Sequence, residues 1–290
     1  MRPLLDHLLT APPPPSPTTA EAWARHYEAL PAAGPDRAIL GGFGGDRPAW
    51  AFASGYRAAL DALLPTANRR AALCITEAGG NHPRAVAAHV EDGALRGEKR
   101  FVFLGPLAER LFVLARSGAE YDGRPLLRIY AVEADAPGVR LMPGPPASVV
   151  PELPHSGLYL DTPAPEPLGG DGWARYARPF RTVEDIHVTL GLLGWGLRLA
   201  RGLPAEVAEG LLPPLLALRA LATLDPRESA THRALAPGLS LAWAALEGLP
   251  WTELGPAADL WARDRVILQI GEPARKRRLA LARQADQRGT

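Results

Sequence analysis

Cysteine is almost absent from this chain of 290 residues, since Cys74 is its one cysteine. A disulfide framework and a cysteine-based zinc site both need several cysteines, so both are excluded. Excess charge of one sign is also lacking, because 32 lysine and arginine residues balance 31 aspartate and glutamate residues to a net charge of +1. The chain as a whole therefore has no field to attract nucleic acid, an anionic membrane or an acidic substrate, and any partner must be recognised at a local site.

Long apolar runs are missing as well. No stretch reaches the roughly 18 apolar residues that a membrane-spanning helix needs, and the N-terminal segment lacks the uninterrupted apolar part of a secretory signal. We therefore expect a cytoplasmic protein. With 47% hydrophobic and 22% charged residues the composition is that of a globular protein, and a chain of this length divides into about two domains.

Common catalytic signatures are absent too. The seven histidines include no pair at i, i+4 spacing on a predicted helix, so the sequence gives no support for a metal site. Neither a G-x-S-x-G nucleophile elbow nor a Walker A phosphate loop occurs. The glycine-rich segment 41–45 does not have the G-x-G-x-x-G spacing of a dinucleotide-binding turn, and we predict a plain loop there.

The hydrophobic pattern divides the chain into three parts. Helical periodicity predicts helices over 19–30 and 50–64, preceded by an arm of about ten residues and a proline-rich tether. Seven short apolar runs then predict a small antiparallel sandwich or barrel: 71–76, 86–90, 101–104, 111–115, 126–132, 139–142 and 158–160. Amphipathic segments with short connections predict a four-helix bundle over 182–200, 204–224, 227–249 and 257–284, the last broken at Pro273. The sequence thus predicts an α+β fold with domains at 1–66, 67–170 and 171–290.

Short motifs follow one another through the middle of the chain. They are Ile75–His82 (I-T-E-A-G-G-N-H), Gly97–Phe103 (G-E-K-R-F-V-F), Leu114–Ser117 (L-A-R-S) and Pro137–Val139 (P-G-V). With the order of helical region, β domain and bundle, they resemble the acyl-CoA dehydrogenase family, whose strings are T-E-P-G-A-G-S-D, G-x-K-x-W-I-T, V-A-R-S and P-G-V. The resemblance covers roughly residues 50–288.

This resemblance implies a flavoenzyme. In that family FAD lies between the β domain and the bundle, and a glutamate removes the α proton of an acyl-CoA thioester while hydride leaves the β carbon for the flavin. Carried over by motif, the flavin-binding residues are Thr76, Glu77, Phe101 and Phe103, and the substrate-binding residues are Asn81, His82, Arg275 and Arg278. For the basic run 275–278 a solvated helix face is the simpler interpretation. The implied partners are acyl-CoA or another acyl thioester, and a second copy or a related dehydrogenase in an oligomer.

Two glutamates compete for the role of the base. Glu184 lies at the predicted start of the first bundle helix, where it resembles the base of one family branch, and Gly191 on the same face would leave room for a ligand. Glu272 precedes the last helical segment, where other branches keep their base. Ordinary explanations stand beside both. Thr182 and Asp185 form a capping box in which Glu184 only stabilises the helix end, and Glu272 is a surface acid.

The sequence also departs from the family pattern. Phe101 and Phe103 stand where the family has tryptophan and threonine, so a hydroxyl contact to the flavin is lost, and residues 81–82 replace a serine. The helical region before the β domain is shortened, and the glycine strings that grip the adenylate are missing. A second hypothesis is therefore a non-catalytic relative without FAD that acts as a partner subunit or acyl-binding protein. Trp195 and Leu192, off the main apolar stripe of their helix, are expected at an oligomer contact or in the core.

Overall fold

The computed structural model describes residues 2–121 and 124–288 and divides the chain into two compact units. The β unit comprises residues 63–147 and 151–180. The helical unit comprises the chain up to residue 62, residues 148–150 and the chain from residue 181 on. The α+β fold class is confirmed. None of the helices in these ranges is long and apolar enough to cross a membrane.

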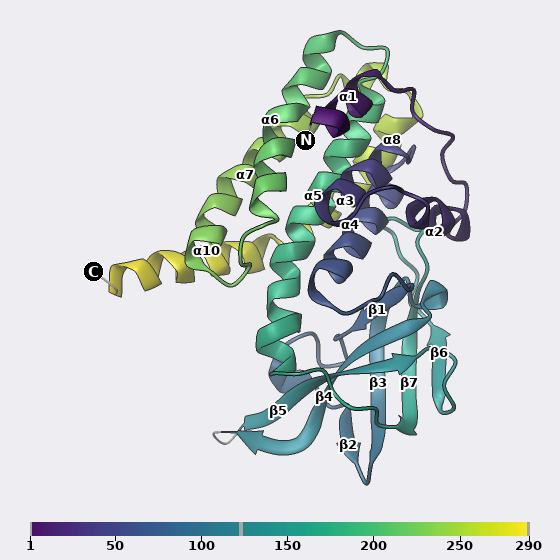
Figure 1. Cartoon of the computed structure of the whole chain (residues 1–290), viewed down its shortest axis with the longest axis vertical. Coiled ribbons are helices and arrows are strands. Elements are labelled where there is room, and N and C mark those ends of the chain that lie inside the picture. The colour runs from purple at the N-terminus through teal and green to yellow at the C-terminus, as the bar shows by residue number, and fades with distance from the viewer. Residues whose placement is uncertain (1, 122–123, 289–290) are drawn as a thin grey trace. The chain divides into compact units, whose positions relative to one another are not determined.

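A sheet of seven strands forms the β unit (Figure 1). Each strand overlaps one of the apolar runs that predicted it, because alternating and branched apolar side chains suit a pleated, half-buried surface. The strands are β1 (Ala71–Cys74), β2 (His89–Glu91), β3 (Ala94–Phe103), β4 (Arg110–Tyr121), β5 (Arg124–Glu133), β6 (Val139–Pro143) and β7 (His155–Pro163).

The strand order is β1-β4-β2-β3-β7-β6, with β5 also paired to β4. Most pairs are antiparallel, as predicted, but β4 runs parallel to both β1 and β2. The segment 75–88 between β1 and β2 does not reverse the chain, so both strands point the same way along β4. The interior of the sheet holds small and branched apolar side chains, among them Ala72, Leu95, Val113 and Leu158.

The helical unit contains most of the α-helices, and the predicted helices are confirmed. The last predicted bundle segment is divided into three shorter helices. The helices are α1 (Arg2–Thr10), α2 (Ala20–Glu28), α3 (Gly34–Phe43), α4 (Pro48–Leu63), α5 (Arg178–Leu199), α6 (Ala205–Leu221), α7 (Ser229–Glu247), α8 (Pro256–Asp264), α9 (Ile267–Ile270) and α10 (Glu272–Arg288).

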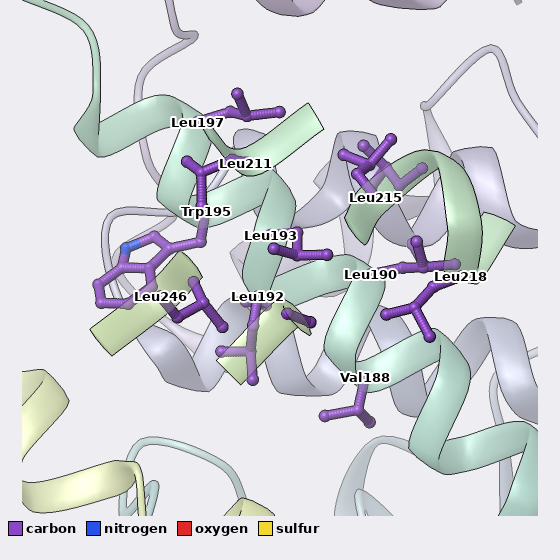
Figure 2. Packing of buried hydrophobic residues seen from close by; sticks show 14 of the residues in the cluster. Val188, Leu190, Leu192, Leu193, Trp195, Leu197, Leu211, Leu215, Leu218 and Leu246 are labelled. Carbon is purple, nitrogen blue, oxygen red and sulfur yellow. The ribbon is translucent and has the colours of Figure 1, made fainter. Parts of the chain in front are cut away.

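The core of the helical unit surrounds α5 (Figure 2). Leucines of α5, α6 and α7 interdigitate there, and Trp195 is fully buried and packs against the rings of Trp251 and Trp261. Leu192 is buried in the same cluster. Both Trp195 and Leu192 therefore serve the core, and the alternative of an oligomer contact is wrong.

The N-terminal helix α1 belongs to this core. Leu8 is 1% exposed and lies in the same apolar cluster as α5. The Arg201 guanidinium donates hydrogen bonds to the carbonyls of Leu9 and Ala11, the second at 2.7 Å. Residues 2–10 are thus fastened to the helical unit, and within this described segment the expected separate arm is not found.

The glycine-rich segment 41–45 is not the predicted loop, because α3 continues through Phe43. Its glycines allow two helices to approach closely. A Cβ on Gly42 would lie 1.8 Å from the carbonyl oxygen of Gly191, and a Cβ on Gly194 would lie 2.2 Å from that of Ile39. The sequence showed the glycines but not the neighbouring backbone that requires them.

Gly191 itself is closed off by α4. A Cβ there would lie 2.4 Å from the carbonyl oxygen of Ala51. The space that the sequence suggested for a ligand beside Gly191 is therefore filled by helix backbone, and that expectation is wrong.

We predict that Gly191→Ala destabilises the chain by about 1–3 kcal/mol, because the new methyl group has no room beside the Ala51 carbonyl. The matched control is Gly210→Ala on α6, where a Cβ meets nothing within 4 Å. That change should be neutral or stabilising, since alanine is the better helix former. Urea unfolding of both variants measures the difference, and equal stabilities would contradict the close packing of α5.

Candidate functional site

The first two motifs meet at a tight turn and a strand. After β1 the chain turns at Glu77 and Gly80, whose backbones exchange hydrogen bonds of 3.0 and 2.9 Å. The Arg100 amide of β3 donates to the carbonyl of Thr76 at 2.7 Å. The structure thus brings the Thr76 turn and the strand of Phe101 together.

A buried ion pair joins the same segments from inside. Lys99 Nζ lies 2.5 Å from Glu77 Oε1, and its side chain has no exposed surface. The Glu77 carboxylate also accepts the amides of Ala87 and Ala88 at 2.6 and 3.1 Å. Lys99 donates in addition to the carbonyl of Leu114, in the third motif. Burial lowers the pKa of Lys99, and the neighbouring carboxylate opposes that shift.

Glu77, the acid of the first motif, is therefore a buried structural residue of the β unit. Glu77 is 7% exposed, and both of its carboxylate oxygens accept hydrogen bonds. It fixes the Thr76 turn against β3, while Thr76 itself is partly exposed. The fourth motif is also structural, because a Cβ on Gly138 would lie 1.8 Å from the carbonyl oxygen of Asp161.

A β-bulge places Phe101 on the surface. The pairing of β3 with β7 shifts register between Lys99 and Val102, both of which point inward. Phe101 lies within the bulge at φ +53 and is 56% exposed. A positive φ is unfavourable for an aromatic residue, and strained positions of this kind cluster at active sites and ligand-binding segments.

Phe101 shares its side of the sheet with residues of β6 and β7. Residues of β7 alternate, so His155, Gly157 and Tyr159 share one side of the strand and buried side chains the other. The His155 ring stacks with Phe101 at a centroid distance of 6.2 Å and an interplanar angle of 17°. Met142 of β6, 46% exposed, is paired with Gly157. We call Phe101, His155, Gly157, Tyr159 and Met142 the aromatic face.

The other residues of this region border the aromatic face. Phe103 pairs with His155 across the strands, so the two side chains share a side of the sheet. Arg140 lies over the Tyr159 ring at 4.3 Å. Sequence motifs indicated Phe101 and Phe103 but not His155, Gly157 and Tyr159. Their signal was the alternation in H-S-G-L-Y, which carries ring side chains and a glycine on one side.

The predicted substrate-binding residues of the first motif follow directly after the turn at Glu77–Gly80 and lie on the surface. Asn81 and His82 are both exposed. His82 Nδ1 accepts the Arg84 amide at 3.2 Å and so caps a short helical turn. The predicted substrate roles of both residues stay predictions.

Glu184 lies within α5 and not at its start. The helix begins at Arg178 and follows a helical turn over Trp173–Ala177, so Thr182 is an interior residue and the predicted capping box does not exist. Burial raises the pKa of Glu184. The Arg181 guanidinium opposes this shift, with its Nη1 3.3 Å from Glu184 Oε2. An acid with a raised pKa is better suited to accept a proton than an exposed one.

The two arginines predicted to bind substrate form ion pairs within the helical unit. Arg275 and Arg278 of α10 donate to the two oxygens of Asp185 at 2.9 and 2.6 Å. This pairing fastens α10 to α5. Glu272 is exposed and pairs with Lys276 at 2.6 Å, which lowers the pKa of Glu272.

We predict that Lys99→Met and Glu77→Gln each destabilise the chain by about 3–5 kcal/mol, because each leaves the other partner charged and buried. The double variant should lose less than the sum of the two. Urea unfolding measures all three. The control is Arg96→Met, which removes exposed ion pairs with Glu91 and Asp161 and should change stability little. Additive losses at Lys99 and Glu77 would contradict the coupling.

This chain is similar to known proteins in fold but not in sequence. No family model and no curated protein matches the sequence. The FAD complex of PigA matches at TM-score 0.64 and 15% identity, over 99% of this chain and 93% of that chain. Butyryl-CoA dehydrogenase from Megasphaera elsdenii matches at TM-score 0.62 and 15% identity, over 92% and 89%. FkbI, a protein for biosynthesis of a methoxymalonyl extender unit, matches at TM-score 0.59 and 16% identity, over 89% and 87%. The chain therefore has the acyl-CoA dehydrogenase-like fold that its motifs predicted.

Proposed function

We propose that this chain is a flavoprotein oxidoreductase that binds FAD on the aromatic face and dehydrogenates an acyl thioester between its α and β carbons. The observation that carries the proposal is the exposed Phe101 in a bulge that a buried ion pair and the Thr76 backbone hold in place. Structures with the same fold are a FAD complex and a butyryl-CoA dehydrogenase. These relatives support the cofactor and the thioester substrate.

The aromatic face fits a flat heteroaromatic ring. Phe101 and His155 present nearly parallel rings, and Gly157 beside them carries no side chain. A Cβ on Gly157 would meet Met142 at 3.4 Å, so a larger side chain would occupy the surface over the sheet. Ring stacking favours such a group, and backbone amides with Thr76 supply polar contacts at the border.

Of the two candidate bases, the structure favours Glu184. Its carboxylate is largely buried and its pKa is raised, whereas the pKa of the exposed Glu272 is lowered by Lys276. A general base works best with a pKa near the operating pH. FAD, when bound, supplies the hydride acceptor for this chemistry. Glu184 takes the α proton of the thioester onto a carboxylate oxygen.

The packing at Gly191 favours a second candidate function, that of a non-catalytic partner subunit or acyl-binding protein. The α4 backbone fills the space beside that residue, and Asp185 occupies both Arg275 and Arg278. A relative that has given up the substrate pocket and acts as a partner subunit or acyl-binding protein would show the same features. FAD uptake by the purified chain separates the two functions.

We predict that the purified chain binds FAD and shows the absorption bands of a protein-bound flavin. Phe101→Ala should weaken FAD binding about 3- to 10-fold, because the stacking surface is lost. Ile270→Ala, an apolar change at a more exposed position (69%) in the helical unit, should leave the affinity unchanged. Fluorescence titration measures both. A colourless chain that takes up no FAD supports the partner subunit instead.

We predict that Glu184→Gln retains FAD and lowers acyl-CoA turnover by about 100- to 10,000-fold. Glu272→Gln should leave turnover unchanged, since Glu272 is an exposed acid. Steady-state assays with acyl-CoA of several chain lengths measure the two variants. A chain that turns over acyl-CoA at the same rate in both variants excludes Glu184 as the base.

We also predict how the stability of the Glu184→Gln variant depends on pH. Because burial raises the pKa of Glu184, the folded chain holds this proton more tightly than the unfolded chain, and ionisation costs stability as the pH rises. The unfolding free energy of Glu184→Gln relative to the unmodified chain should therefore increase from about pH 4 to about pH 8. Urea unfolding at several pH values tests this, and a decrease would show that Arg181 outweighs burial.

A further inference from the structure

We propose that His155 hydrogen-bonds to the polar edge of the flavin and so sets both the affinity and the reduction potential of the bound cofactor. This inference rests on the proposed function. It assigns a polar contact on the aromatic face that neither Phe101 nor Phe103 can make, since both carry plain hydrocarbon rings.

The placement of His155 comes from two independent contacts. It pairs with Phe103 across β3 and β7, and its ring stacks with Phe101. A ligand bound at the Phe101 ring therefore lies next to the imidazole. Gly157, two residues along the same side of β7, leaves that approach open.

The protonation of His155 follows from its partner. Its Nε2 is hydrogen-bonded to the carbonyl oxygen of Pro145, and a carbonyl can only accept, so Nε2 carries a hydrogen. In the neutral ring Nδ1 is then an acceptor, and in the protonated ring it is a donor. The polar edge of a flavin offers both N–H and C=O groups, so Nδ1 has a partner in either state.

The Pro145 contact also fixes the ring. It links the first residue of β7 to the loop after β6, so the imidazole is held before the cofactor arrives. A group that is already oriented loses little entropy on binding. His155 is therefore held in one orientation, unlike a surface residue without such contacts.

The test uses His155→Phe and His155→Gln, with FAD as the probe. His155→Phe keeps a stacking ring and loses the nitrogen, so the dissociation constant for FAD should rise about 3- to 10-fold, and the flavin absorption spectrum and reduction potential should shift. His155→Gln retains an amide donor and acceptor and should recover part of the affinity. The control His89→Phe makes the same change on β2, away from the aromatic face, and should leave all three quantities unchanged.

The outcomes distinguish the inference from the function on which it rests. If the unmodified chain takes up no FAD, the proposed function fails. If it takes up FAD but His155→Phe keeps the affinity, spectrum and potential of the unmodified chain, the role of His155 is refuted. A loss of thermal stability in both His155 variants without a flavin-specific shift also refutes it, because that pattern is expected of the Pro145 contact alone.

Discussion

The ion pair between Glu77 and Lys99 is the constraint on which the candidate site depends. Its partners belong to different motifs, and Lys99 reaches the carbonyl of a third through Leu114. A buried pair of charges is stable only when its remaining hydrogen bonds are satisfied, and here the amides of Ala87 and Ala88 complete the carboxylate. Because the pair lies directly before the bulge, it fixes where β3 turns Phe101 outward.

The helical unit follows a different constraint, the absence of side chains where helices meet. Gly42, Gly191 and Gly194 bring α3, α4 and α5 within reach of one another's carbonyl oxygens. Such contacts tolerate no added methyl group. The contact of α5 with α10 is made by a polar residue instead. Asp185 makes this contact by holding Arg275 and Arg278 of α10. Packing thus takes up residues that the motif comparison would assign to a ligand.

The sequence predicted the strands, most helices and the fold class because these depend on local periodicity, which β1 through β7 and α5 through α7 express clearly. Its motifs singled out Phe101 and Thr76, whose flavin contacts stay predictions. It could not show that Gly42 belongs to a helix, since that glycine is required by the backbone of α5. It also missed His155, whose role depends on strand register with Phe103, a property of the folded sheet. The capping box at Thr182 was wrong because the helix starts earlier, at Arg178.

The central claim is that a flavin binds over the aromatic face and not elsewhere on the chain. Hydrogen–deuterium exchange with and without FAD tests it directly, because amide protection reports where a ligand stabilises the backbone. The account predicts slower exchange in the bulge around Phe101 and in β7 from His155 to Tyr159 when FAD is added. Unchanged exchange in both segments, with protection confined to other parts of the chain, would contradict it.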